Sequence, residues 1–311
     1  MSNIMKVGII GIGGTGGYIS AMLCKNNEEV YLIARGKNLD VIKEKGLTLN
    51  SEVEGNFVVK PKVVTNDSNE AGIMDVIFVC VKGYSLEEAA KSILPMVDEH
   101  TIVIPIINGV NGDSKLYSYL RKGQVAEGVI YIVSQIERPG VINHTTKNKK
   151  VIIGENKKRP IDKNALKEVY KILTNARIIC EIREDVEVAA WEKYIFNCAF
   201  NITDSYYDVN TKGIIEDEEK FNTFCNLAKE CEVIGRAKGV NLPNDIYDTT
   251  LNILKNLDGS STSSMHRDVS NKKKFELELF SGELIKMGDE LGIPTPYSKK
   301  AYEKLNKLQH K

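Results

Sequence analysis

The chain has no excess charge of either sign. Its 42 lysines and arginines balance 42 aspartates and glutamates over 311 residues. Such a balance offers no general attraction to nucleic acid or to an anionic membrane, so any anion site has to be local. We therefore expect neither nucleic acid nor a membrane as a partner, and the sequence leaves a homodimer open.

Metal-ligand and disulfide patterns are also lacking. The six cysteines include no Cys-x-x-Cys pair, and the four histidines are widely separated, so no zinc-type spacing exists. The longest apolar runs, such as Val76–Val81 and Ile102–Ile107, have the length of a strand and not of a membrane span. Because we find no secretory signal, we expect a cytoplasmic protein with free thiols and no metal site.

The first half of the sequence alternates short β-branched runs with helical stretches. This pattern is typical of a largely parallel sheet with helices on both faces. The expected buried strands are Lys6–Ile10, Val30–Ala34, Val76–Val81 and Thr101–Ile107. Pro105 argues that the last strand ends early or leaves the ladder there. Further strand-forming runs, of which the first two favour a hairpin or crossover insertion, are Leu47–Leu49, Phe57–Val59, Val125–Val133, Val141–His144 and Val151–Ile153.

The second half is compatible with helix almost throughout. The expected helices are Val186–Ile202, Asp217–Lys238, Asn244–Leu257, Met265–Leu291 with an interruption or bend, and Pro296–Lys307. We therefore predict an α/β fold with two domains: an N-terminal Rossmann-type doubly wound sheet over residues 1–180, and a C-terminal all-helical domain over residues 181–311. Pockets favour such junctions, so we expect the substrate where the two domains meet.

A glycine-rich segment directly follows the first expected strand. It matches Gly-x-Gly-x-x-Gly and consists of Gly11, Ile12, Gly13, Gly14, Thr15 and Gly16. The first glycine permits a tight turn, the second lets a pyrophosphate approach the backbone, and the third allows close packing of helix on strand. We predict a dinucleotide site here; the alternative is a sharp turn that binds nothing.

The end of the second strand bears on the choice of cofactor. A site for NAD normally has an acid there that accepts a hydrogen bond from the ribose 2′-hydroxyl. Here Arg35 follows the strand and no acid occurs before Asp40. A guanidinium suits a 2′-phosphate, so the sequence favours NADP(H). A solvated Arg35 is the alternative, and an Asp40 that curled back would reopen the question.

Two further strand ends carry polar residues. Lys82 follows the strand Val76–Val81, and Asn108 follows Thr101–Ile107. In open α/β sheets, ligands bind beyond the carboxyl ends of the strands, which is where a nicotinamide ribose would lie. Each residue alone is more typical of a turn; their joint placement beside the glycine loop favours cofactor contacts.

The most specific pattern lies in the helical half. Lys193, Asn197 and Asn201 recur at i, i+4 and i+8, so they form one stripe on a helix that is otherwise largely apolar. The simple alternative is a solvated stripe on a surface helix. Because helices that are apolar nearly all round are buried, we expect the stripe to face a polar pocket. A lysine placed there is suited to donate a proton to a developing alkoxide.

A serine-rich segment further along carries more candidates. Ser264 stands where a helix begins, so it is either a helix N-cap or an anion contact. Glu276 follows twelve residues later and could face the lysine across a cleft. The run Lys272–Lys274 is expected to be solvated.

These residues together resemble the ketopantoate reductase (2-dehydropantoate 2-reductase) family. The resemblance covers essentially the whole chain, and its specific part is the Lys-x-x-x-Asn-x-x-x-Asn helix followed by Ser-Ser-Met. It implies an NADPH-dependent reduction of 2-dehydropantoate to (R)-pantoate, on the way to pantothenate and coenzyme A. The chain would accordingly be an oxidoreductase acting on a small 2-oxo acid.

The resemblance also implies roles for individual residues. Lys193 would be the general acid, and Glu276 would orient it and contact the cofactor. Asn197 and Asn201 would bind substrate oxygens and Ser264 the carboxylate. The cofactor contacts would be the glycine loop, Arg35 at the 2′-phosphate, and Lys82 and Asn108 near the ribose and nicotinamide.

The chain departs from the family after Asn201. The family usually runs Pro-Leu-Thr-Ala-Leu there, whereas this chain has Ile202–Tyr207 with the sequence Ile-Thr-Asp-Ser-Tyr-Tyr. This difference leaves open a reductase of another branched 2-oxo acid on the same fold. A third reading, a non-catalytic module that senses NADPH, has no need for the proton donor.

Overall fold

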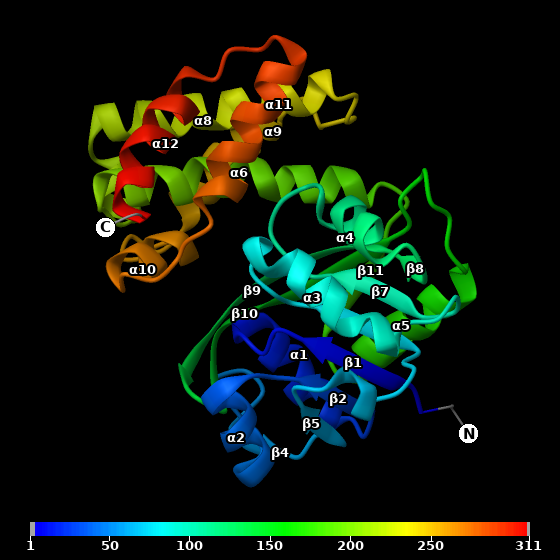
Figure 1. Ribbon diagram of the computed structural model, residues 1–311. Helices are drawn as coiled ribbons and strands as arrows, with labels where there is room; N and C mark the ends of the chain where they lie inside the picture. Colours follow the sequence, from blue (N-terminus) through cyan, green and yellow to red (C-terminus); the bar gives the residue numbers. More distant parts are fainter. Residues whose placement is uncertain (1–3, 310–311) are drawn as a thin grey trace. The chain divides into compact units, whose positions relative to one another are not determined.

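The computed structural model describes residues 4–309, apart from the side chains of Lys147 and Asn148. The chain divides into two compact units between Val186 and Glu187. The strand β11 (Ile179–Ile182) pairs in parallel with β10 (Val141–Gly154), so it belongs to the first unit. Figure 1 shows both units, coloured along the sequence.

The first unit contains the predicted parallel sheet, together with an edge strand, β5, that was not among the expected strands. Its strands run in the order β5-β2-β1-β6-β7-β8, and every neighbouring pair is parallel. The bounds are β1 Lys6–Ile10, β2 Glu29–Ile33, β5 Val63–Thr65, β6 Val76–Val79, β7 Ile102–Pro105 and β8 Gln124–Val125. The strand β7 ends at Pro105, as expected of a residue that cannot donate to the ladder.

Helices cover both faces of this sheet because both faces are apolar. Along β1, Val7 and Ile9 face the cluster that contains α1, whereas Ile10 faces the cluster that contains α3 and α4. The helices of this unit are α1 Gly14–Lys25, α2 Gly36–Lys45, α3 Leu86–Ile93, α4 Gly112–Leu120 and α5 Lys163–Asn175, with short 3₁₀ turns at Ser68–Glu70 (η1), Gly83–Ser85 (η2) and Leu94–Met96 (η3). The doubly wound α/β arrangement is thereby confirmed.

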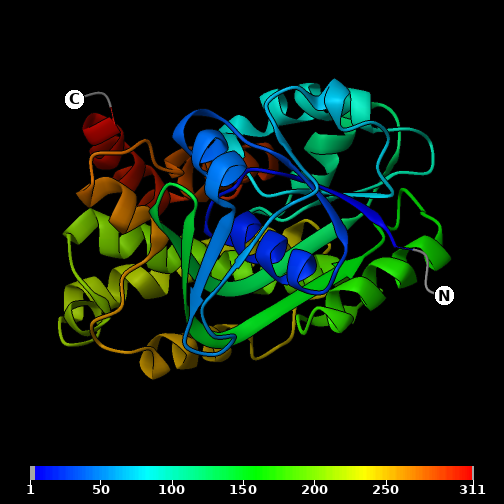
Figure 2. The same ribbon diagram turned by 90° about the horizontal axis from the view of Figure 1, so that it is seen from below.

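The remaining strands form a second, mixed sheet, which the sequence did not indicate. Its strands are β3 Leu47–Ser51, β4 Phe57–Val59, β9 Glu127–Arg138, β10 Val141–Gly154 and β11 Ile179–Ile182. The predicted hairpin is confirmed by the antiparallel β3–β4 pair, but β3 also pairs in parallel with β10, far along the chain. Helix α1 packs against strands of both sheets, and Figure 2 shows it (dark blue) beside the long green strands β9 and β10.

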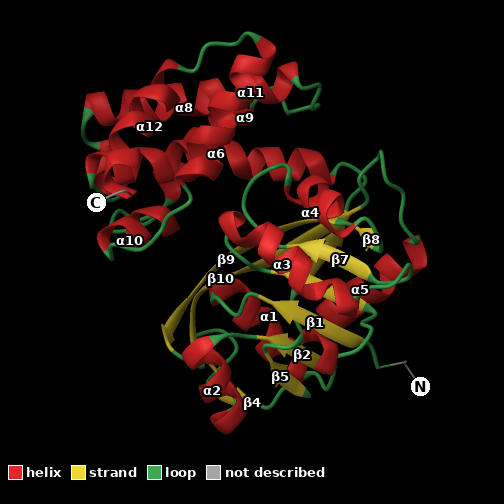
Figure 3. Cartoon of the chain, viewed as in Figure 1, coloured by secondary structure: helices red, strands yellow, loops and turns green. Residues whose placement is uncertain are grey.

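In its described part, residues 187–309, the second unit consists of helices joined by loops, which Figure 3 shows in red and green. Its elements are α6 Val186–Tyr207, α7 Thr211–Ile215, α8 Glu218–Ala237, α9 Ile246–Asn256, α10 Ser264–Ser270, a π-helical turn η4 Glu278–Gly282, α11 Glu283–Leu291 and α12 Pro296–Gln309. The expected interruption after Met265 is confirmed: α10 ends at Ser270 and helix resumes only beyond Glu276. Helix α6 is longer than predicted. Among the described residues, none of the helices combines the length and apolarity needed to cross a bilayer.

Buried side chains of α6 and α8 hold the helical unit together. A Cβ on Gly235 of α8 would lie 2.8 Å from the ring of Trp191 on α6, so glycine permits this close approach. Trp191 meets Tyr194 edge to face, and the Tyr194 hydroxyl donates to the carbonyl of Leu279 at 2.6 Å. These contacts fix α6 in its unit, and α6 carries the predicted polar stripe.

Candidate active site

The glycine loop has the three steric properties that a dinucleotide site needs. Gly11 has a φ of +90°, and a Cβ there would lie 2.6 Å from the carbonyl of Cys80. A Cβ on Gly16 would lie 2.2 Å from the carbonyl oxygen of Gly11, so the helix can approach the strand only with glycine here. A Cβ on Gly13 would meet nothing within 4 Å. Gly11 and Gly16 therefore have no room for a side chain, whereas the space beside Gly13 is open. A pyrophosphate would approach the backbone there.

The start of α1 also suits an anion. Its N-cap residue, Gly13, makes no side-chain capping hydrogen bond, and the first turn has no acidic residue. Helix N-termini present N–H groups and partial positive charge, so these conditions favour phosphate groups. The residues present thus fit a dinucleotide.

Arg35, Lys82 and Asn108 follow three strands whose carboxyl ends meet at the edge of the sheet that also carries the glycine loop. Arg35 follows β2, Lys82 follows β6, and Asn108 follows β7, where Gly109 turns with a φ of +97°. Since β2 and β6 both pair in parallel with β1, and β7 with β6, the sheet brings these residues together with Gly11–Gly16.

Two residues at this edge were missed in the sequence. Asn38 accepts from the N–H of Gly140 at 2.9 Å and donates to the carbonyl of Ile12 at 3.2 Å, so it braces the glycine loop from α2. Glu88 on α3 forms an ion pair with Arg35. Asp40, the acid considered earlier, lies in α2 and is exposed. No local pattern could have found Glu88, because it lies far from Arg35 in the sequence.

In the helical unit, the candidate general acid has an altered acidity. Burial lowers the pKa of the Lys193 ammonium to about 8, and the negative charge of Glu276 acts against this shift. The Glu276 side chain is buried, with 4% of the residue exposed, and it directly precedes the helix that continues as η4. The structure therefore brings the two predicted catalytic groups within electrostatic range, although they are 83 residues apart (276 − 193).

The asparagines of the stripe differ in their surroundings. Asn201 is buried, donates to the carbonyl of Asn197 at 2.9 Å and accepts from the N–H of Met265 at 3.2 Å. Asn197 is half-buried. Asn201 therefore ties α6 to the first turn of α10, and only one of its two amide hydrogens is used in this way.

The start of α10 differs from the expectation by one residue. Ser263, and not Ser264, is the N-cap: its hydroxyl accepts from the N–H of His266 at 3.0 Å. Ser264 is the first helical residue and is half-buried. The sequence Ser263-Ser264 offers two equivalent hydroxyls, and the backbone of the preceding loop decides which one caps.

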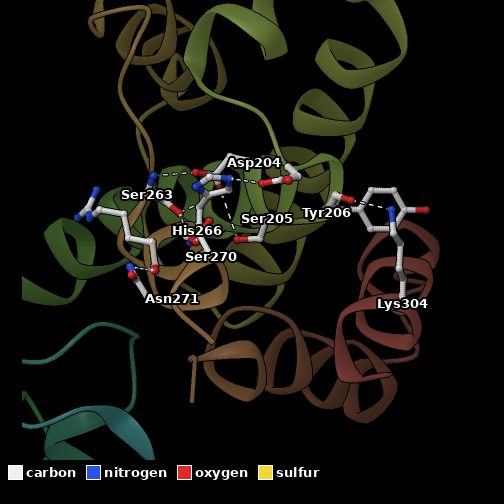
Figure 4. A network of polar contacts seen from close by, with 10 residues as sticks. Asp204, Ser205, Tyr206, Ser263, His266, Ser270, Asn271 and Lys304 are labelled. Atoms are coloured by element: carbon white, nitrogen blue, oxygen red, sulfur yellow. Dashed lines mark hydrogen bonds and ion pairs between the residues drawn. The ribbon is translucent and has the colours of Figure 1, made fainter. Parts of the chain in front are cut away.

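A buried carboxylate on α6 anchors this cap. Asp204 accepts from the N–H of Ser263 at 2.7 Å and from its hydroxyl at 2.9 Å, as Figure 4 shows. Burial raises the pKa of Asp204 to about 7, and the hydrogen bonds from Ser263 oppose this shift. Asp204 lies in the segment that departs from the family pattern, so this anchor belongs to the unusual part of the chain.

The two tyrosines of the same segment line a separate hollow. This cavity of about 440 Å³ is formed by the end of α6 and the starts of α8 and α12, and its lining is Tyr206, Tyr207, Glu218, Glu219, Asn222, Thr223, Tyr297, Lys300 and Ala301. The Tyr207 hydroxyl donates to Glu219 at 3.0 Å, and the carbonyl of Tyr206 accepts from Lys304 (Figure 4). The residues predicted for the substrate are not among the lining.

These features define a class of protein. A doubly wound sheet with a dinucleotide-type glycine loop, joined to a helical unit in which a half-buried lysine lies within electrostatic range of a buried glutamate, is suited to a nicotinamide-dependent oxidoreductase.

The chain belongs to the ketopantoate reductase family. The model of ketopantoate reductase PanE/ApbA matches residues 7–158, and the model of its C-terminal part matches residues 185–309. Together they span both units.

Individual relatives agree over nearly their full length. An uncharacterized oxidoreductase of Bacillus subtilis, YkpB, is 28% identical over 97% of this chain and 98% of its own. The 2-dehydropantoate 2-reductase of Aquifex aeolicus is 27% identical over 94% and 93%. A crystal structure of a PanE/ApbA family ketopantoate reductase from Ralstonia eutropha is 26% identical, with a TM-score of 0.90 over 98% of this chain and 99% of that chain.

The same fold also serves another substrate. A ternary structure of D-mandelate dehydrogenase with NADH and anilino(oxo)acetate has a TM-score of 0.88 over 98% of both chains, at 20% identity. Membership of the family therefore establishes an oxidoreductase, and leaves the cofactor and the particular substrate to a further argument.

Proposed function

We propose that this chain reduces 2-dehydropantoate to (R)-pantoate with NADPH, as a step towards pantothenate and coenzyme A. The observation that carries the proposal is the Lys193–Glu276 pair, because a lysine whose pKa lies at about 8 can give up its proton near neutral pH. The family membership and the relative named 2-dehydropantoate 2-reductase support the choice of substrate. We also propose that the reaction takes place in the cytoplasm.

The side chains proposed to act on the substrate all belong to the second unit. A bound nicotinamide cofactor would supply the hydride for the carbonyl carbon of the oxo acid. Lys193 gives its proton to the carbonyl oxygen, which becomes the hydroxyl of the product, and Glu276 orients the ammonium and meets the cofactor. The substrate's oxygens are bound by Asn197 and by the amide hydrogen of Asn201 that Asn197 does not use, and its carboxylate is bound by Ser264.

The cofactor is held by the first unit. Gly11, Ile12, Gly13, Gly14, Thr15 and Gly16 receive the pyrophosphate at the start of α1. Arg35 binds the 2′-phosphate, and Lys82 and Asn108 contact the ribose and nicotinamide.

Steady-state NADPH oxidation with 2-dehydropantoate, followed by absorbance, tests the proposal. Lys193→Ala should lower turnover on the order of 10²–10⁴-fold, the range for a positioned acid–base group, while NADPH affinity changes little. Lys273→Ala, a change in the exposed run beyond α10, is the control and should keep full activity. Near-full turnover of Lys193→Ala would refute the mechanism.

A second candidate is a reductase of another branched 2-oxo acid. It is favoured by the departure at Ile202–Tyr207 and by the relative named D-mandelate dehydrogenase. A panel of 2-oxo acids separates the candidates, since the preferred substrate has the highest kcat/KM. Tight NADPH binding without oxidation by any member of the panel would instead indicate a sensing module.

A further inference from the structure

The acid that the sequence lacks at the end of β2 is supplied from another element. Glu88 lies in the first turn of α3, and its carboxylate oxygen Oε1 is 2.5 Å from Nη1 of Arg35. Helix α3 follows β6, whose carboxyl end lies at the same edge of the sheet as that of β2. The fold thus places a carboxylate beside the guanidinium proposed for the 2′-phosphate.

Both members of this pair face solvent. The side chains of Arg35 and Glu88 are 56% and 64% exposed, so either can rearrange without disturbing the core. Neighbouring Glu87 pairs instead with Lys91 on the same helix, at 2.7 Å. The carboxylate of Glu88 is therefore specifically directed at Arg35.

The two cofactors respond to such a pair in opposite ways. A 2′-phosphate carries close to two negative charges, so it competes with Glu88 for the guanidinium and is repelled by the carboxylate. The 2′-hydroxyl of NAD(H) carries no charge and can donate to a carboxylate, which is how acids at this place in other dinucleotide sites favour NAD.

We propose that Glu88 is a specificity-determining residue that weakens the preference for NADP(H) over NAD(H). The inference rests on the proposed role of Arg35 as the ligand of the 2′-phosphate. The sequence around β2 points to Arg35 alone as the determinant of the cofactor, and the structure adds an acid from α3.

The size of the effect follows from the exposure of the pair. Exposed ion pairs contribute little, so we expect Glu88→Gln to tighten NADP⁺ binding by roughly two- to fivefold, where fivefold corresponds to about 1 kcal/mol. NAD⁺ binding should stay the same or weaken. Glu88→Lys should enlarge the change in the same direction.

Isothermal titration calorimetry with NADP⁺ and NAD⁺ measures this directly, without turnover. Adenosine 2′,5′-bisphosphate and AMP serve as further probes, because they differ only in the 2′-phosphate. Glu87→Gln is the matched control: it removes the same charge one residue away and should leave the ratio of the two dissociation constants unchanged. In an Arg35→Ala background, Glu88→Gln should lose the larger part of its effect, because only the direct repulsion between the carboxylate and the 2′-phosphate is left to remove.

Each outcome bears on one proposal or both. An unchanged NADP⁺/NAD⁺ ratio in Glu88→Gln, or an equal change in Glu87→Gln, overturns the role of Glu88. A shifted ratio in a protein that reduces no 2-oxo acid keeps Glu88 as a determinant and refutes the proposed reaction. Absence of binding for both dinucleotides by the unchanged protein overturns both.

Discussion

Two opposing influences set the acidity of Lys193: burial lowers its pKa to about 8, and Glu276 raises it. The proton donor is the ammonium form, which is populated below this pKa. We therefore expect kcat/KM for oxo acid reduction to be level below about pH 8 and to fall about tenfold per pH unit above it. Initial rates of NADPH oxidation, measured with varied oxo acid and saturating NADPH at each pH, give this profile.

Replacing Glu276 tests the direction in which its charge shifts the pKa of Lys193. Glu276→Gln removes the influence that raises the pKa of Lys193, so the fall in rate should move to lower pH. Glu278→Gln is the control, because Glu278 accepts from the Tyr302 hydroxyl and does not act on Lys193. A profile that stays in place in Glu276→Gln would contradict the role given to that carboxylate.

At the residue scale, the sequence identifies candidates better than it identifies their partners. Lys193 and Glu276 could be named from a helical stripe and a family pattern. The pairing of Arg35 with Glu88 could not, because it depends on how β2 and β6 flank β1. The sequence offers Ser264 as a candidate for the cap that Ser263 forms, since both serines satisfy the same local rule.

At the scale of the element, substitutions at two glycines of one loop should have different effects, one on stability and the other on NADP⁺ binding. Gly16→Ala forces a Cβ to within 2.2 Å of the Gly11 carbonyl, so we expect a loss of about 1–3 kcal/mol in the free energy of unfolding. Gly13→Ala meets nothing within 4 Å and should keep its stability, yet it fills the space in front of the loop and should weaken NADP⁺ binding.

Urea unfolding and calorimetric titration of both variants check this pair. Retained NADP⁺ affinity in Gly13→Ala would show that the pyrophosphate does not approach that backbone. Unchanged stability of Gly16→Ala would mean that α1 can shift away from β1.

The anchor between α6 and α10 should make stability depend on pH. Burial raises the pKa of Asp204 from an ordinary value near 3.8 to about 7, so the folded chain holds a proton that the unfolded chain releases between these values. Stability from this group is therefore full below about pH 4 and is lost as pH rises to 7. Asp204→Asn removes this dependence. The difference in the free energy of unfolding between the variant and the natural chain should therefore shift in the variant's favour by on the order of 1–4 kcal/mol as the pH is raised from about 4.5 to about 8.

Urea unfolding at the two pH values gives this difference. Asp248→Asn, a change at an exposed side chain of α9, is the control and should follow the natural chain. If the free energy of unfolding changed equally with pH in Asp204→Asn and in the natural chain, Asp204 would be ionised in the folded protein.

Elements with a local signal could be predicted, and those formed by distant pairing could not. Strand β1 has the bounds that its apolar run predicts, and β7 stops at Pro105. The second sheet escaped prediction because β3 finds its partner in β10, and no periodicity within either strand shows that choice. Helix α6 runs on to Tyr207 since Asp204 and the tyrosines find partners within the helical unit.

At the scale of the molecule, cofactor binding should affect the two units differently. NADP⁺ is proposed to contact the first unit at residues 11–16, 35, 82 and 108, and ligands stabilise the state that binds them. We expect hydrogen exchange to slow at these loops and in α1, while α8 and α9 change little. Exchange measured by mass spectrometry with and without NADP⁺ checks this. Protection in α8 and α9 alone would be inconsistent with the assigned cofactor site.

The position of α1 between two sheets has a consequence for ligand affinity. A Cβ on Gly14 would come within 2.1 Å of the carbonyl oxygen of Ser134 in β9, and one on Gly17 within 2.5 Å of Ile142 in β10. The turn that is proposed to bind the pyrophosphate is therefore held in place by β9 and β10 when the chain folds. Because such preorganisation leaves little ordering for the moment of association, substitutions in β9 or β10 that shift Ser134 or Ile142 should change the dissociation constant of a dinucleotide.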